Sequence, residues 1–194
     1  DLLKTFGDQR AVDHVDLEVR RGEVFGVLGP NGAGKTTMLK MLATLLPIDG
    51  GRAQIFGHDV RREAHVVRQL LGVTGQYASV DENLTATENL MLFARLSGLS
   101  KRRAEERTGD LLEAFGLADA ADRPTSGFSG GMRRRLDLGA GLVLTPAILF
   151  LDEPTTGLDP QSRRQLWGVL ERFRTAGGTI MLTTHYLEEA EVLS

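Results

Sequence analysis

The apolar positions of this chain fall into short continuous runs separated by longer stretches of helical spacing. The runs have the length of buried strands and lie at residues 23–28, 54–56, 70–74, 147–151 and 179–183. Residues 11–19 alternate partly at period two, which predicts an exposed antiparallel strand near the N-terminus. Strands that alternate with helices indicate an α/β fold with a mostly parallel sheet between layers of helices.

Helices are predicted at residues 36–46, 89–96, 101–115 and 160–176, and after the last strand up to residue 194. Thr85 and Glu88 have the spacing of a capping box. Ser129 is expected to cap a further helix, and Asp159 to cap the helix from residue 160. We therefore expect one domain, with a core of residues 1–76 and 146–194 and a helical subdomain at residues 77–145.

The stretch from Gly29 to Thr37 fits the phosphate-binding pattern Gly-x4-Gly-Lys-[Ser/Thr]. Its glycines allow backbone N–H groups to approach phosphate oxygens, and the helix that follows favours an anion at its N-terminus. Lys35 is expected to bind the β- and γ-phosphates of a nucleotide, and the Thr36 hydroxyl a Mg²⁺ ion. The competing interpretation is a glycine-rich turn between strand and helix that binds no ligand.

Asp152 and Glu153 follow the apolar run at residues 147–151. The carboxyl edge of a parallel sheet is where ligands bind, and successive strand residues point to opposite faces. Asp152 is therefore expected to serve the metal and Glu153 to act as general base on water. Taken alone, such a pair is as often a strand end that meets solvent.

Composition narrows the class of protein. The 194 residues contain no cysteine, which excludes a disulfide framework and thiol chemistry, and the net charge is −3. That balance argues against a nucleic-acid partner. The basic clusters are interpreted as solvated helix faces and lie at residues 20–21, 61–62, 101–103 and 133–135. The most apolar stretch, residues 136–151, is too short and too interrupted to span a bilayer.

The sequence Phe-Ser-Gly-Gly-Met at residues 128–132 resembles the Leu-Ser-Gly-Gly-Gln signature of ABC-transporter ATPases. The other marks of that family follow in the same order: Gln76 after a strand, Asp159 after the acidic pair, and His185 after the last strand. The resemblance implies a P-loop NTPase core with a small antiparallel subdomain and an inserted helical subdomain. It also implies ATP and Mg²⁺ as ligands.

In that family two ATPase domains face head to tail, and each ATP lies between the phosphate loop of one and the signature helix of the other. The residues that the resemblance assigns to the chain's own nucleotide are Gly29, Asn31, Gly32, Ala33, Gly34, Lys35, Thr36 and Thr37. Those assigned to the facing nucleotide or the dimer interface are Ser129, Gly130, Gly131 and Asp159. Glu153, His185 and Gln76 would be catalytic, and Thr36, Gln76 and Asp152 would serve the metal.

Phe6 stands where the family stacks an aromatic ring on adenine, although a core phenylalanine is an open alternative. Met132 replaces the usual Gln of the signature, which removes any polar contact from that side chain. The motifs are most similar to the daunorubicin-resistance type of drug exporter, whose ATPase and membrane subunits are usually separate chains. The chain also starts without Met and stops soon after His185, where the family continues with further strands.

The resemblance thus implies an ATPase at the cytoplasmic face of a membrane that drives export of a small hydrophobic compound. Its expected partners are a second copy of itself and an integral membrane subunit, with no nucleic acid. One alternative is a non-transport ABC ATPase with a regulatory or nucleic-acid-associated role. Another is a nucleotide-dependent interaction module with little turnover, although Glu153 argues against it.

Overall fold

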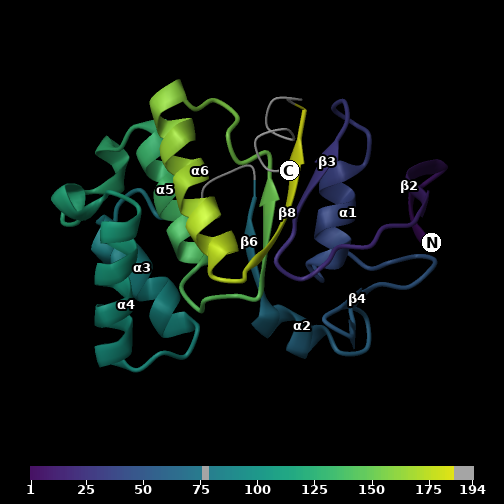
Figure 1. Cartoon of the computed structure of the whole chain (residues 1–194), viewed down its shortest axis with the longest axis horizontal. Helices are drawn as coiled ribbons and strands as arrows, with labels where there is room; N and C mark the ends of the chain where they lie inside the picture. Colours follow the sequence, from purple (N-terminus) through teal and green to yellow (C-terminus); the bar gives the residue numbers. More distant parts are fainter. Residues whose placement is uncertain (76–78, 186–194) are drawn as a thin grey trace.

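The computed structural model describes residues 1–75 and 79–185 of the chain. A parallel sheet of four strands runs through its centre in the order β3-β8-β7-β6 (Figure 1). These strands are β3 (Val24–Leu28), β6 (Leu71–Thr74), β7 (Ile148–Asp152) and β8 (Thr179–Thr184). The predicted α/β class and parallel sheet are confirmed.

Alternation along β7 divides the interior into two apolar clusters. Ile148 and Phe150 pack in the cluster that contains α1 (Lys35–Leu42), whereas Leu149 and Leu151 pack in the cluster that contains α6 (Pro160–Thr175). The sheet is thus the middle layer of three. The same alternation predicts that Asp152, next in the even-numbered series, faces α1.

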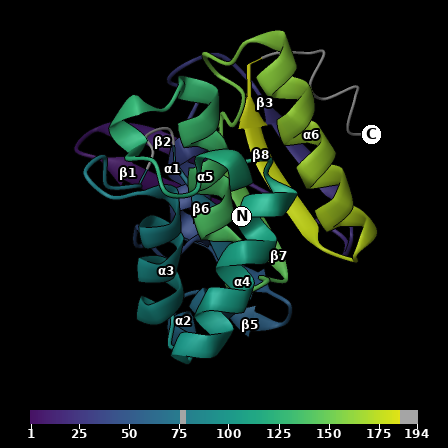
Figure 2. The same cartoon turned by 90° about the vertical axis from the view of Figure 1, so that its left-hand side faces the viewer.

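The predicted helical stretch forms one body beside the sheet, on the left of Figure 1 and toward the viewer in Figure 2. It contains α3 (Ala86–Leu96), α4 (Lys101–Ala114) and α5 (Gly130–Gly141). The Thr85–Glu88 capping box is present at the start of α3, and Ser129 caps α5. These helices share a single apolar cluster with α6 and one face of β7 and β8. The placement of the subdomain boundaries at residues 76 and 146 stays a prediction.

The N-terminal side carries two short antiparallel pairs, β1 (Leu2–Phe6) with β2 (Gln9–Val15) and β4 (Gln54–Ile55) with β5 (His58–Asp59). The strand expected to reach residue 19 ends at Val15. β1, β5 and the short helix α2 (Ala64–Leu70) were not predicted.

Two further expectations need correction or lie outside the described residues. β3 was expected to be a buried strand, but it is an edge strand whose residues are half-buried or exposed, with Leu28 43% exposed. The predicted helix after β8 falls mostly on residues 186–194, which lie outside the described part. Within residues 1–75 and 79–185, no helix has the length and apolarity that crossing a bilayer requires.

Candidate nucleotide site

The turn between β3 and α1 forms an uncapped helix N-terminus. Gly34 takes the N-cap position in the left-handed conformation, with φ of 83°, and no side chain caps the helix. A Cβ at Gly34 would lie 2.0 Å from the Ala11 carbonyl oxygen, so only glycine fits there. The first-turn amides therefore remain available to an anion.

Lys35 lies at the start of α1 and is 7% exposed. Its ammonium donates hydrogen bonds to the carbonyl oxygens of Gly29 (2.6 Å) and Pro30 (2.9 Å). The Lys35 Nζ is also 4.0 Å from Glu153 Oε1. The loop thus holds a buried positive charge beside the amides of the helix N-terminus, as a phosphate-binding site requires.

Asp152 faces α1, as the alternation along β7 predicts. Its two carboxylate oxygens accept from the Thr36 hydroxyl at 2.9 and 2.8 Å, and Oδ1 also accepts from the Thr183 hydroxyl at 2.6 Å. A carboxylate beside a hydroxyl is the hard oxygen donor set that Mg²⁺ prefers. In the described part of the chain, no group of three or more His, Cys, Asp or Glu could hold a metal.

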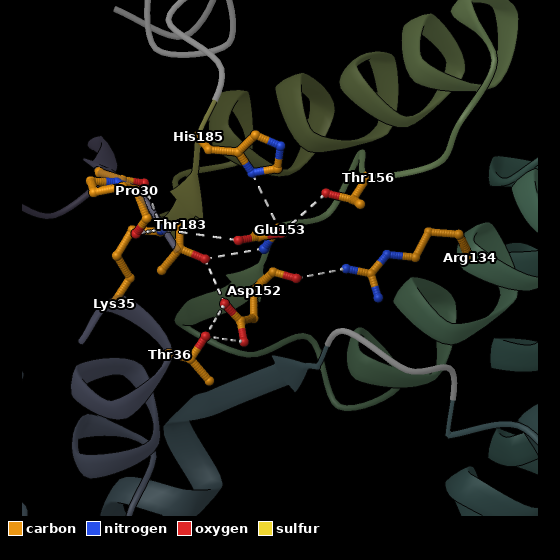
Figure 3. Close-up of polar contacts among 10 residues, drawn as sticks. Pro30, Lys35, Thr36, Arg134, Asp152, Glu153, Thr156, Thr183 and His185 are labelled. Carbon is orange, nitrogen blue, oxygen red and sulfur yellow. Dashed lines mark hydrogen bonds and ion pairs between the residues drawn. The ribbon is translucent and has the colours of Figure 1, made fainter. Parts of the chain in front are cut away.

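Glu153 sits at the point where β7 leaves the sheet, and Figure 3 shows its side chain among the other polar groups. Its carboxylate is 12% exposed and lies 3.6 Å from Nδ1 of His185. The Thr156 hydroxyl donates to it at 3.3 Å. The structure thus brings together Lys35, Asp152, Glu153 and His185 from three separate stretches of sequence, and their predicted roles stay predictions.

A cavity of about 700 Å³ opens over Lys35 and Glu153, two of these groups. Glu153 and all predicted phosphate-loop residues except Gly29 line it: Asn31, Gly32, Ala33, Gly34, Lys35, Thr36 and Thr37. Gly130 at the start of α5 lines the same cavity. Its volume lies in the range of small-molecule sites in proteins.

The start of α5 differs from that of α1. The Ser129 hydroxyl oxygen accepts from the Met132 amide at 3.2 Å, and Ser129 and Gly130 are exposed. Gly131 is buried and packs against α6. A Cβ at this position would lie 2.2 Å from the Ser162 hydroxyl oxygen. The structure thus gives Gly131 a packing role within the chain.

Asp159 caps α6, as predicted. It accepts from the amides of Gln161 and Ser162 at 3.0 Å and from the Ser162 hydroxyl at 2.6 Å. The hydrogen bond from that hydroxyl, together with the backbone bonds, lowers the pKa of Asp159. The second role expected of Asp159, at a dimer interface, stays a prediction.

The predicted roles of Gln76 and Phe6 are not tested by the described residues. Gln76 lies outside the described residues. Phe6 is 51% exposed at the end of β1 and is not among the residues that line the cavity, while the Lys4 ammonium lies 5.3 Å from its ring centroid. The alternative of a core phenylalanine is therefore wrong, and stacking on adenine stays a prediction.

The interpretation of the basic cluster at residues 133–135 as a solvated face is wrong. Arg134 and Arg135 are 9% and 8% exposed. Burial lowers the pKa of Arg134, and it raises the pKa of its partner Asp137, which is 3% exposed. The signal missed in the sequence was Asp137 itself, three residues along the same helix.

Two other residues near the site were not predicted. Ala11 of β2 lines the cavity, and its carbonyl explains why Gly34 must be glycine. Thr183 is the register partner of Asp152 across β7 and β8 and binds its carboxylate. The position of Thr183 at the end of a parallel strand was the available signal.

Comparisons with known proteins agree with this geometry. The family model described as "ABC transporter" matches residues 12–156. The chain is 58% identical over 193 residues to the daunorubicin/doxorubicin resistance ATP-binding protein DrrA of Streptomyces peucetius, and covers 58% of that protein. It is 46% identical over 192 residues to the Nod factor export ATP-binding protein I of Ralstonia nicotianae, and covers 60% of it. Those alignments take in 100% and 99% of this chain.

A solved structure described as the ATP binding subunit of an ABC transporter superposes with a TM-score of 0.87 at 30% identity. The superposition covers 100% of this chain and 80% of the other. The chain spans about three fifths of the length of the curated relatives it matches. With the phosphate loop, the acidic strand end and the Ser-Gly-Gly helix all in place, this chain belongs to the ABC transporter family.

Proposed function

We propose that this chain binds ATP and hydrolyses it between two copies of itself, and that this drives export of a small hydrophobic compound through a membrane subunit. The observation that carries the proposal is the position of Glu153. Its carboxylate lies within 4.0 Å of both the phosphate-loop lysine and His185, at the mouth of the phosphate loop.

The phosphate groups of ATP would lie on the free amides at the start of α1. The Lys35 ammonium would leave its loop carbonyls and bind the β- and γ-phosphate oxygens. Thr36 and Asp152 would hold Mg²⁺, which neutralises charge on the β- and γ-phosphates when bound. Gln76 is proposed to contact the metal and the water.

In the hydrolytic step a water oxygen attacks the γ-phosphorus, and the bond from that phosphorus to the oxygen of ADP breaks. Glu153 accepts a proton from the attacking water. His185, whose Nδ1 lies 3.6 Å from that carboxylate, would contact the γ-phosphate. In phosphoryl transfer, most of the rate enhancement comes from the positioning of the reactants and from electrostatic stabilisation of the transition state.

A second copy would complete the site. Ser129 and Gly130 are exposed at the start of α5 and would face the γ-phosphate bound by the other copy. Gly131 would contribute by keeping this helix close to α6, and Asp159 would lie near the interface. The free amides of a helix N-terminus and the absence of bulky side chains favour this use.

The proposed cargo and location rest on the relatives. The names of two relatives refer to daunorubicin and doxorubicin resistance and to Nod factor export, and both describe ATP-binding proteins. We infer that this chain acts at the cytoplasmic face of a membrane, where it docks on a separate integral membrane subunit. The exported compound is proposed to be small and hydrophobic.

The test is Glu153→Gln in the full-length protein. Loss of a general base costs about 10²–10⁴ in rate, so hydrolysis should fall by that factor while ATP binding persists. ATP should then hold two copies together, which size-exclusion chromatography with ATP would detect. Glu105→Gln, which changes an exposed carboxylate on α4, is the matched control. Hydrolysis by Glu153→Gln at the wild-type rate would disprove the assignment of the base.

A further inference from the structure

Glu153 has an unusual backbone conformation that the phosphate loop does not explain. Its φ is 48°, in the left-handed region that residues with a side chain rarely adopt. Such a conformation persists only where the surroundings hold it. Its amide is held by Thr183, through both the carbonyl and the hydroxyl oxygen at 3.1 Å. The carbonyls of Asp152 and Pro154, on either side of Glu153, are supported by a different residue.

Arg134 of α5 supplies that support. Its Nε donates to the Pro154 carbonyl at 3.0 Å, and its Nη2 donates to the Asp152 carbonyl at 3.2 Å. One guanidinium therefore spans the carbonyls of the residues before and after Glu153. Figure 3 shows the Arg134 side chain reaching from α5 to the Asp152 carbonyl.

The guanidinium is itself fixed in place. Its Nη1 donates to the Gly75 carbonyl at the end of β6 and lies 3.5 Å from Oδ2 of Asp137. Asp137 in turn accepts from the Ser79 amide at 2.6 Å. The Arg134–Asp137 pair thus joins the residues on either side of residues 76–78 to the strand end that carries Glu153.

A purely structural role is the competing interpretation, because buried arginines often satisfy carbonyls without any effect on catalysis. The chain offers a matched case. Arg107 of α4 donates to the carbonyls of Leu142 (2.7 Å) and Val143 (3.2 Å), which follow the far end of α5. Each arginine binds the carbonyls of at least two residues, but only Arg134 binds carbonyls on both sides of Glu153.

We propose that Arg134 is a positioning residue for Glu153, holding the carboxylate where it accepts the proton of water. The inference rests on the proposed function, since it assigns Arg134 to the base of that reaction. The proposal gives two parts of α5 different roles. The exposed first turn is proposed to face the second copy, whereas the buried Arg134–Asp137 pair acts on Glu153 of the same chain. Arg134 also lines the cavity, but its guanidinium is held by the carbonyls of Gly75, Asp152 and Pro154, and in this proposal it acts through Glu153.

The test is Arg134→Lys in the full-length protein. Lysine keeps the charge beside Asp137, but its compact ammonium does not reproduce the planar fork that spans two carbonyls. We expect kcat to fall about tenfold, because small misplacements of a catalytic group have large effects. The KM for ATP should stay within about threefold, because the phosphate loop is untouched. Arg107→Lys should leave both constants unchanged, with thermal unfolding as the check on folding.

The double variant Arg134→Lys/Glu153→Gln distinguishes positioning from a general loss of structure. If Arg134 acts through Glu153, adding Arg134→Lys to Glu153→Gln should lower the rate by less than about twofold further. A full additional tenfold loss would overturn the inference, as would a wild-type kcat in Arg134→Lys. An equal loss of kcat in Arg107→Lys would also overturn it.

Failure of the proposed function gives a different result. Glu153→Gln at the wild-type rate would reject the base and this inference together, whereas an inactive Glu153→Gln with a fully active Arg134→Lys rejects the inference alone. If Arg134→Lys does not fold, Asp137→Asn replaces it, because it keeps the side-chain volume and removes only the charge that fixes the guanidinium. A folded Asp137→Asn should lose two- to fivefold in kcat on the same argument, and a wild-type kcat would overturn the inference.

Discussion

Helices α1 and α5 both begin next to the same cavity, but their N-termini are built differently. α1 starts from a glycine in the left-handed conformation with no side-chain cap, and its first residue is a buried lysine. α5 starts from Ser129, whose hydroxyl oxygen already accepts from the Met132 amide. Neither helix carries an acidic residue in its first turn.

The difference indicates that the two ends have unequal roles. The α1 end combines free amides with a positive charge, so it can bind phosphate by itself. The α5 end is neutral in its first two residues and partly self-capped, so it is suited to add contacts to a phosphate that is held elsewhere. The comparison therefore favours a site built from the α1 end of one copy and the α5 end of the other.

The largest effect should come from Lys35→Ala, which removes the charge from the α1 end. Hydrogen bonds to charged groups contribute about 1.5–3 kcal/mol, so ATP affinity should fall about 10- to 100-fold and hydrolysis should be lost. Isothermal titration with ATP and a phosphate-release assay measure both, with circular dichroism as folding control. Unchanged affinity would mean that α1 is not the primary anion site.

Ser129→Arg changes the α5 end and should lose hydrolysis while it keeps ATP affinity. ATP affinity should stay within about threefold of wild type, because the loop of the same copy is intact. Hydrolysis should fall at least about 100-fold, because a bulky side chain would block the facing nucleotide. Isothermal titration measures the ATP affinity and a phosphate-release assay measures hydrolysis. Hydrolysis at the wild-type rate would show that α5 does not face a nucleotide.

Gly130→Ala and Gly131→Ala sharpen the comparison within α5. A Cβ at Gly131 meets Ser162 at 2.2 Å, whereas at Gly130 it meets nothing within 4 Å. Gly131→Ala should therefore lower the free energy of unfolding by about 1–3 kcal/mol, and adding Ser162→Gly should restore part of it. Gly130→Ala should change it by no more than about 1 kcal/mol. Equal losses in chemical denaturation would contradict the packing role of Gly131.

The smallest effect concerns the pH dependence of the Asp159 cap beside Gly131. Because its folded-state pKa is lowered from the ordinary value of 3.8, Asp159 stabilises the fold at pH values above 3.8. That stabilisation is lost as pH falls through the folded-state pKa. Wild type should therefore exceed Asp159→Asn in unfolding free energy at pH 6, with the difference shrinking below pH 3.8. A constant difference across that range would contradict the lowered pKa.

The nucleotide site was largely predictable because its chemistry is encoded locally. The phosphate loop is contiguous from Gly29 to Thr37, and alternation along β7 was enough to place Asp152 on the α1 side of the sheet. Glu153 follows the end of β7 and also lies near α1, 4.0 Å from Lys35, so alternation does not account for its position. The capping residues Thr85, Ser129 and Asp159 depend only on neighbours within three positions, so they too were found.

The parts that were missed depend on contacts between distant segments. Three consecutive arginines at residues 133–135 predict a solvated face. Asp137 was a local signal for an ion pair, but nothing local shows that the carbonyls near Glu153 bind Arg134. The partial exposure of β3 depends on its place at the edge of the sheet, which its apolar sequence does not encode. The contact of Gly131 with Ser162 likewise exists only once α5 packs on α6.

The most direct test of the composite site mixes Ser129→Arg with Lys35→Ala, two variants that should each be inactive alone. A mixed pair contains one site with an intact α1 end and an intact α5 end. With free exchange, half of the pairs are mixed and each has one good site, so hydrolysis should recover to about a quarter of the wild-type rate. No recovery in a mixture shown by cross-linking to contain mixed pairs would contradict the account.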